Sequence, residues 1–179
     1  MFSCFMESRI CPEDRQGAGG RDKDKERESA VSKPSPYRIS TLTINSLAPT
    51  MCNHRHPLGG RNFESFSEDP FLAGKMAAHV VQGIQAQGIA ATIKHFAANE
   101  SETDRLTADE IIPERALREI YMKPFEIAVR DAKPWAIMTA YNQINGTHAD
   151  SHEFMLKQVL RGEWGWKGLV MSDWVRSSF

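Results

Sequence analysis

The chain has 179 residues, enough for one domain with a core but short of the roughly 250 that a closed eight-unit (β/α)8 barrel needs. Its 22 basic and 23 acidic residues are interleaved, which gives no indication of a nucleic-acid or membrane partner. The 3 cysteines at irregular spacing exclude a disulfide framework, and no stretch is apolar enough to span a bilayer.

The first part of the chain is predicted to be disordered or unrelated to the rest over residues 1–44. Charged residues, Gly, Ser and Pro dominate residues 12–36, and such a run buries too little apolar surface to offset its ordering entropy. The apolar patch at the start is broken by Glu7 and Arg9, so no signal peptide is recognised. As written, the sequence predicts a cytoplasmic protein whose folded domain covers residues 45–179.

The folded part is predicted to alternate helices with short apolar strands. Asp69-Pro70 starts a helix, with an acid at the N-cap and proline at the first helical position. The helix ends at Gln87-Gly88, and a strand follows at Ile89–Ile93, ending in Lys94-His95-Phe96.

Two further units follow the same pattern. A helix opens at Pro113, with a kink at Pro124, and leads to a strand at Trp135–Ala140. A third helix, capped by Ser151, returns to a short buried strand at Gly168–Met171.

Repeated helix–strand units predict a parallel sheet with right-handed crossovers. One interval between strand ends is close to the about 31 residues that a barrel unit takes, and the polar loop Asn99–Asp109 lengthens the other. The sequence therefore predicts an α/β fold, specifically a partial (β/α)8 TIM-like barrel. A doubly wound open sheet is the alternative.

The predicted strand ends carry side chains capable of chemistry. Lys94 and His95 place a cation beside an imidazole, Tyr141 adds a hydroxyl, and Asp173-Trp174 places a carboxylate beside an indole. In a parallel barrel the carboxyl ends of the strands form the active-site mouth. Alternatively, Asp173 caps a following helix and the other groups are structural.

A second informative stretch lies between residues 57 and 70. The pair Gly59-Gly60 permits a tight turn, after which Arg61 presents a forked donor set suited to hydroxyls or a carboxylate. A structural ion pair of Arg61 with Glu64 or Glu68 is equally consistent with the spacing. Cys52–His56 contains ligand-type residues, but neither a metal site nor a cofactor is predicted there.

Four segments of the sequence together resemble the N-terminal catalytic barrel of glycoside hydrolase family 3, most closely that of fungal β-glucosidases. The resemblance covers roughly Leu47 to Trp174, and the combination is specific although each piece alone is not. The segments, in chain order, are GRNFESFSEDP at 60–70, KHF at 94–96, MTAYN at 138–142 and VMSDW at 170–174.

This resemblance implies roles for individual residues. Asp173 corresponds to the catalytic nucleophile of a retaining β-glucosidase acting on terminal non-reducing β-D-glucosyl residues. Arg61, Lys94 and His95 correspond to groups that bind sugar hydroxyls. The remaining matches, which would line the same pocket close to the nucleophile, are Tyr141, Met138 and Trp174.

The chain also departs from the family pattern. No counterpart is found for the early strand whose aspartate binds the sugar, and the chain stops at Phe179, before the domain that usually supplies the acid/base glutamate. The expectation is thus an incomplete and inactive fragment with β-glucosides or oligosaccharides as its ligands. Its oligomeric state is left open.

Three alternatives to β-glucosidase chemistry follow. In the first, the chain is a pseudo-enzyme with weak sugar binding. In the second, it is an aldolase-type barrel with Lys94 as a Schiff-base amine. Within the family, xylosidase activity stays open, whereas the residues after Lys94-His95-Phe96 lack the proline, glycine and histidine of the N-acetylglucosaminidases.

Overall fold

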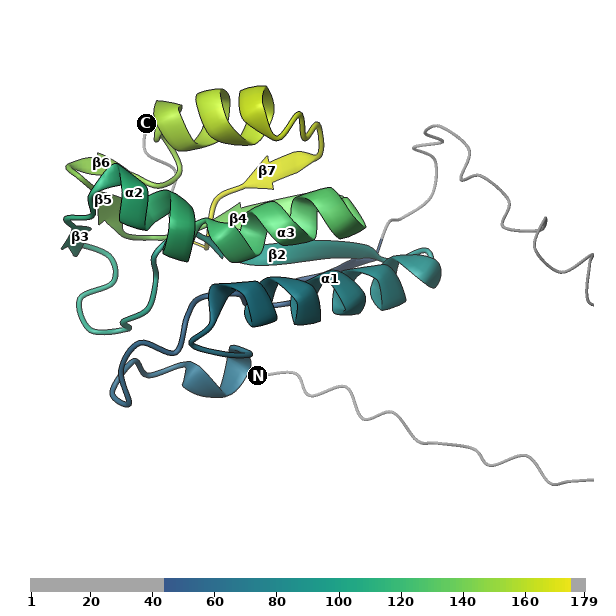
Figure 1. Cartoon of the computed structure of the whole chain (residues 1–179), viewed down its shortest axis with the longest axis horizontal. Coiled ribbons are helices and arrows are strands. Elements are labelled where there is room, and N and C mark those ends of the chain that lie inside the picture. Colours follow the sequence, from purple (N-terminus) through teal and green to yellow (C-terminus); the bar gives the residue numbers. More distant parts are fainter. Residues whose placement is uncertain (1–43, 175–179) are drawn as a thin grey trace, which may run out of the picture. The chain divides into compact units, whose positions relative to one another are not determined.

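A computed structural model describes residues 44–174 of the chain (Figure 1). The predicted disordered segment, except for Ile44, lies outside the described residues. The elements, in chain order, are β1 (Asn45–Ser46), η1 (Asn62–Glu64), α1 (Pro70–Ala86), β2 (Ala90–Phe96), β3 (Asp109–Glu110), α2 (Glu114–Ala116), η2 (Leu117–Tyr121), α3 (Lys123–Ala132), β4 (Ala136–Thr139), β5 (Gln143–Ile144), β6 (Thr147–His148), η3 (Phe154–Glu163) and β7 (Leu169–Met171).

The main sheet has 4 strands in the order β1-β2-β4-β7, and every neighbouring pair is parallel. Helices α1 and α3 pack side by side along the sheet, as Figure 1 shows. The predicted α/β class, with parallel strands and alternating helices, is confirmed. A closed barrel of this type has eight strands, so the described sheet is half of one.

The core lies between the sheet and these helices. Phe96 of β2 meets Phe125 of α3 edge-to-face, with ring centroids 5.1 Å apart. Ile93 and Ile137, on the two central strands, are fully buried. Such aromatic and aliphatic burial is the main contribution to holding the sheet against its helices.

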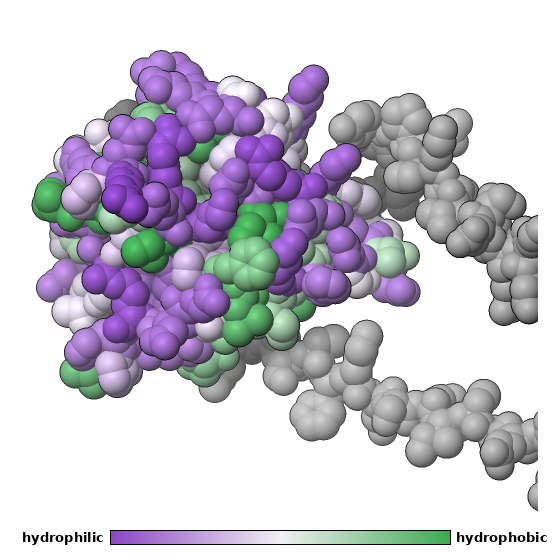
Figure 2. All heavy atoms as spheres, viewed as in Figure 1, coloured by the Kyte–Doolittle hydropathy of each residue, from purple (hydrophilic) through white to green (hydrophobic). Residues whose placement is uncertain are grey.

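The outer surface is mostly hydrophilic on the face shown in Figure 2, with a smaller apolar patch near its centre. Within residues 44–174, no helix has the length and apolar character needed to cross a membrane.

Two local predictions are confirmed in detail. Asp69 caps α1, because its Oδ1 accepts a hydrogen bond of 2.8 Å from the Phe71 backbone N–H, and Pro70 is the first helical residue. The predicted kink at Pro124 is a break: η2 ends at Tyr121 and α3 begins at Lys123. Proline cannot donate to the preceding turn, so the helix is interrupted there.

The cap predicted for the third helix is wrong. The Ser151 hydroxyl donates to the carbonyl of His148, and η3 begins only at Phe154, after Glu153, with no side-chain cap. Serine hydroxyls readily form hydrogen bonds to nearby backbone groups in turns. Here the Ser151 hydroxyl bonds within the turn and therefore does not cap the helix.

Two features were not predicted from the sequence. Strand β1 precedes the first predicted strand and extends the sheet beside β2. A small second sheet, β3-β5-β6, contains a hairpin whose turn is Asn145-Gly146, with φ values of 50° and 82°. Asn-Gly is the strongest short-range signal for such a turn, so the sequence did carry this information.

The strand that precedes Asp173 is not the buried strand that was predicted. It lies at the end of the strand order, and Leu169 is 60% exposed. Its apolar sequence would suit a central parallel strand covered on both faces, but within residues 44–174 only β4 pairs with it.

This open edge predicts self-association of the 179-residue chain. Exposed backbone and apolar side chains on an edge strand pair readily with other chains. Light scattering coupled to gel filtration should detect species larger than a monomer. Leu169→Lys should reduce them, whereas Leu58→Lys, in an exposed loop, should not. A monodisperse monomer with sharp thermal unfolding would contradict this expectation.

Candidate active site

The predicted site residues gather at the carboxyl ends of the main sheet. Lys94 and His95 lie in β2, Tyr141 follows β4, and Asp173 follows β7. The loop leading to Arg61 is held beside β2, because the Met51 backbone N–H donates to the carbonyl of Lys94 at 2.7 Å. Parallel strands end at one edge of a sheet, and this brings residues distant in sequence together.

A buried contact joins Asp173 to His95. The His95 Nε2 lies 3.5 Å from Asp173 Oδ2 and 3.4 Å from Arg61 Nη1, and both His95 and Asp173 are buried. Burial lowers the pKa of His95 to about 3, and the charges of Arg61 and Lys94 add to this effect. The imidazole is therefore neutral near pH 7, and its contact with Asp173 is not an ion pair.

Glu64 orders the two cations of the site. Its carboxylate accepts hydrogen bonds from Arg61 Nε at 3.0 Å and Nη2 at 2.9 Å, and from the Thr50 hydroxyl at 2.9 Å. Lys94 Nζ lies 4.0 Å from the same carboxylate. Burial alone would raise the pKa of Glu64, but the bonds from Arg61 and Thr50 outweigh it and lower the pKa. The ion pair of Arg61 with Glu64 considered from the sequence is thus present.

Lys94 and Arg61 also respond to the nucleophile candidate. Burial is the largest effect on Lys94 and lowers its pKa. Glu64 opposes this effect, the positive charge of Arg61 adds to it, and Asp173 opposes it in turn. Burial acts to lower the pKa of Arg61, but Glu64, Glu102 and Asp173 raise it overall. Arg61 therefore stays charged, and Asp173 lies within the field of both cations.

The remaining predicted site residues are Tyr141, Met138 and Trp174. The Tyr141 hydroxyl donates to the Trp174 carbonyl at 2.5 Å, and burial followed by the negative charge of Asp173 raises its pKa. Met138 is buried in β4, paired in register with Met171 of β7. The side chain of Trp174 is exposed, while its backbone N–H donates to Asp173 Oδ1 at 2.8 Å. The alternative that Asp173 caps a following helix concerns residues outside the described range.

The sequence of residues 29–178 matches the glycosyl hydrolase family 3 N terminal domain. The chain belongs to glycosyl hydrolase family 3.

Several similar proteins are β-glucosidases. Beta-glucosidase B of Emericella nidulans is 73% identical over 128 residues, which are 72% of this chain and 15% of that protein. The crystal structure of the Kluyveromyces marxianus β-glucosidase in complex with glucose is similar with a TM-score of 0.72 and 54% identity, over 73% of this chain and 16% of that one.

A bacterial structure gives the same picture. β-Glucosidase 3B of Thermotoga neapolitana in complex with glucose has a TM-score of 0.72 and 57% identity, and the match covers 73% of this chain and 18% of that one. The family 3 chain thus spans less than a fifth of the length of these relatives.

Two site residues of the family 3 chain were not selected from its sequence. Glu102 and Arg105 lie on the loop after β2, which was expected only to hold an insertion. The Arg105 guanidinium lies over the Tyr141 ring, 4.7 Å from its centre. The spacing of Arg105 and Tyr141 along the chain does not predict this contact, because it joins two separate loops.

Arg61 and His95 are among the residues that line a small pocket. It has a volume of about 10 Å³, room for roughly one water molecule and too little for a sugar. Cys52 lines it, and burial raises the pKa of that thiol to about 12, so it is not a thiolate nucleophile at neutral pH. Burial also raises the pKa of Glu100, which lines the same pocket, to about 7.

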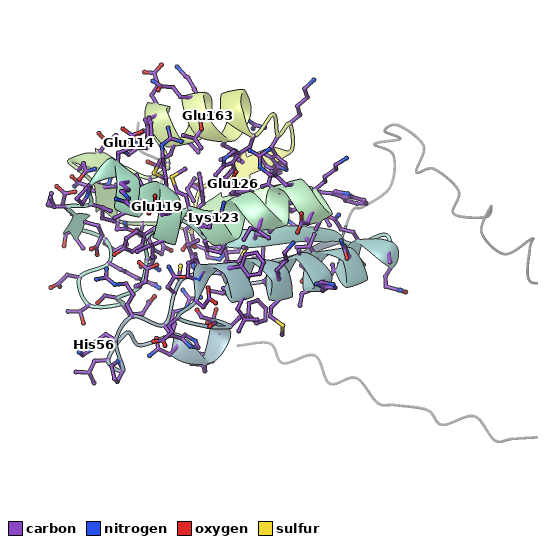
Figure 3. All side chains as sticks on the ribbon, viewed as in Figure 1. His56, Glu114, Glu119, Lys123, Glu126 and Glu163 are labelled. Carbon is purple, nitrogen blue, oxygen red and sulfur yellow. The ribbon has the colours of Figure 1, made fainter. Side chains whose placement is uncertain are left out.

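The histidines near Cys52 have other partners. His54 Nε2 lies 2.7 Å from the Asn62 carbonyl, and His56 Nδ1 accepts a bond from the Leu58 backbone N–H at 3.1 Å. His56 lies on the loop that precedes η1 (Figure 3), and the Asn62 side chain donates to its carbonyl at 2.9 Å.

A larger groove lies on the outer surface between η2, α3 and η3 (Figure 3). Four of its charged side chains form two pairs with one another, and Glu119 pairs with Arg115 beside the groove. Arg118 donates to Glu163 at 2.7 Å and 2.9 Å, and Lys123 donates to Glu126 at 3.0 Å. None of the predicted site residues lines it.

The neutral state of His95 predicts a pH dependence of stability. Its pKa is about 3 in the folded chain and about 6.5 when unfolded, so the unfolded chain binds the proton first as the pH falls. The free energy of unfolding should decrease from about pH 6.5 downward, by at most about 5 kcal/mol from this group.

Urea unfolding at a series of pH values would measure the effect. The difference between the wild-type chain and His95→Gln should shrink steadily as the pH is lowered from 7 to 4, because glutamine has no charge to acquire. His79→Gln, on exposed positions of α1, is the matched control. A difference that does not change with pH would mean that His95 titrates normally.

Proposed function

We propose that this chain supplies the nucleophile and the sugar-binding groups of a retaining β-glucosidase that hydrolyses terminal non-reducing β-D-glucosyl residues. The observation that carries the proposal is the cluster at the carboxyl ends of β2, β4 and β7. There Asp173 lies beside a neutral imidazole, in the field of Arg61 and Lys94. The β-glucosidases named above, two of them in complex with glucose, support it.

In this proposal the carboxylate of Asp173 attacks the anomeric carbon of the sugar. The glycosidic bond to the leaving oxygen breaks, and a covalent glycosyl-enzyme forms that water then hydrolyses. Arg61 and Lys94 place positive charge near this carboxylate. The donors of Arg61, Lys94 and His95 would bind sugar hydroxyls, with bonds that strengthen as the ring distorts in the transition state.

Tyr141, Met138 and Trp174 would shape the same subsite. The Tyr141 hydroxyl lies next to Asp173, and the exposed indole of Trp174 would offer an apolar face to the C–H groups of a sugar. None of these steps calls for a cofactor.

The proposal also requires a second carboxyl group about 5–5.5 Å from Asp173 to protonate the leaving oxygen. Glu64 does not fit that role, because its pKa is lowered and both its oxygens accept hydrogen bonds. Glu102 is engaged by Arg105 and lies near Arg61. We therefore assign the acid/base to neither of these two carboxylates.

Two alternatives give different results in the same experiments. A Schiff-base role for Lys94 needs a neutral amine. Burial and the charge of Arg61 lower the pKa of Lys94 and favour that form, whereas Glu64 and Asp173 oppose it. A protein that binds sugar without turnover would keep the Arg61 and Lys94 contacts and lack hydrolysis.

A chimaera tests the proposal directly. The matching 128 residues of Beta-glucosidase B from Emericella nidulans are replaced by those of this chain, which are 73% identical. The chimaera should hydrolyse an aryl β-glucoside and release β-glucose first, as followed by NMR. A chimaera that folds and binds glucose without hydrolysis would favour the binding-only alternative, and borohydride trapping at Lys94 the Schiff base.

A further inference from the structure

The loop that follows β2 carries a carboxylate between two arginines. Glu102 Oε2 accepts a hydrogen bond from Arg105 Nη1 at 2.6 Å, and Glu102 Oε1 lies 3.6 Å from Arg61 Nη1. The same Oε1 accepts from Asn99 Nδ2 at 3.3 Å. One side chain thus contacts a residue of the Gly-Gly-Arg loop and two residues of its own loop.

We propose that Glu102 is a positioning residue of the candidate site, where it holds the guanidinium groups of Arg61 and Arg105 in place together. The inference rests on the proposed function for its consequence on sugar binding, but not for the geometry. Glu102 reaches the nucleophile side of the site through Arg105, which lies over the ring of Tyr141. It reaches the β2 side through Arg61, which lies 3.4 Å from His95.

Electrostatics explain why a carboxylate is needed at this position. Two guanidinium groups on neighbouring loops repel each other, and partly buried charges are less screened than exposed ones. The side chains of Glu102 and Arg61 are 24% and 25% exposed, so an anion between the cations has a real effect. Glu102 is among the groups that raise the pKa of Arg61.

The backbone of the two loops is built around this carboxylate. The Glu102 backbone N–H donates to the Gly59 carbonyl at 3.0 Å. A Cβ at Gly60 would lie 2.9 Å from the Glu102 side chain, and the φ of Gly60 is +95°. Glycine at position 60 therefore lets the two loops approach, a requirement that the sequence motif alone did not explain.

The two arginines should respond unequally to loss of Glu102. Arg61 also makes two bonds to Glu64, whereas Arg105 has Glu102 as its ion-pair partner among the described residues. Removal of the charge should release Arg105 strongly and Arg61 weakly. A residue with only a structural role would instead change the stability of the chain without this asymmetry.

The test uses the full 179-residue chain with Glu102→Gln, which keeps the shape and removes the charge, and Glu102→Asp, which keeps the charge. Glu119→Gln, which breaks an exposed pair with Arg115, is the matched control. Nitrogen-15 NMR of the guanidinium groups reports hindered rotation, and a glucose titration reports affinity. The chimaera with the same substitutions separates kcat from KM.

In Glu102→Gln we expect the Arg105 guanidinium to rotate freely, Arg61 to stay hindered, and the dissociation constant for glucose to rise about tenfold. In the chimaera KM should rise about tenfold with kcat within about threefold: Arg61, whose bonds strengthen in the transition state, stays held by Glu64, and only Arg105 loses its place over the Tyr141 ring. Glu102→Asp should recover most of both effects, and Glu119→Gln should show neither.

Each contrary outcome has one meaning. Hindered Arg105 rotation in Glu102→Gln, or an unchanged KM in a folded chimaera, overturns the positioning role. A wild-type chain that binds no glucose and an inactive parent chimaera, combined with release of Arg105 in Glu102→Gln, would overturn the proposed function and leave the positioning role standing.

Discussion

Replacing Asp173 with alanine in the chimaera should reduce turnover of an aryl β-glucoside on the order of 10⁴-fold or more. The carboxylate supplies the bond to the anomeric carbon, so its removal eliminates the covalent step. Asp173 is buried beside His95 and near two cations, and a methyl group leaves a space there for a small anion.

Azide should therefore restore activity to this variant. It would attack the anomeric carbon from the side vacated by the carboxylate, forming a C–N bond as the aryl oxide leaves, and the product would be the α-glucosyl azide. NMR of the product distinguishes this outcome from ordinary hydrolysis. Asp131→Ala, which removes an exposed partner of Lys75 on the outer helices, is the control and should keep full activity. Near-normal turnover of Asp173→Ala without azide would remove Asp173 from the nucleophile role.

The second large effect is expected for Lys94→Ala. Its ammonium group lies 4.0 Å from Glu64 and within the field of Asp173, with only 16% of the side chain exposed. A charged hydrogen-bond donor to a sugar hydroxyl acts most strongly in the transition state, so kcat/KM should fall about 100-fold or more. Both kcat and 1/KM should decrease, and the product should still be β-glucose, since the nucleophile is unchanged.

The matched control for Lys94→Ala is Lys123→Ala, which breaks a pair with Glu126 on the outer surface. Equal losses in the two variants would indicate a general loss of folding. A change in the stereochemistry of the product with Lys94→Ala would mean that the lysine takes part in forming the bond rather than in binding hydroxyls.

Much of the fold could be predicted because local signals agreed with the final packing. The Asp69-Pro70 cap and the break before Pro124 follow from the geometry of single residues. Strand β1 was missed because 2 residues carry no periodicity. The position of β7 at the edge of the sheet depends on which strands lie beside it. An apolar run has the same sequence pattern in a central strand and in an edge strand, so its position could not be predicted.

The site residues that were predicted differ from those that were missed in the same way. Lys94, His95, Tyr141 and Asp173 could be placed together because parallel strand ends share one edge. Glu64 was considered only as a partner of Arg61, and its contact with Lys94 joins a loop to a strand. Glu102 and Arg105 depend on the approach of two loops, which spacing along a chain does not encode.

The edge position of β7 has a consequence for the order in which the site becomes ordered. Edge strands open more readily than central ones, because one side of their backbone lacks the hydrogen bonds that resist fraying. Arg61, Lys94 and His95 lie on or beside the central strand β2, whereas Asp173 follows a strand of 3 residues at the margin. Amide hydrogen exchange would therefore be slower in β2 and β4 than in β7. The groups that bind sugar would persist through local openings in which the nucleophile is displaced.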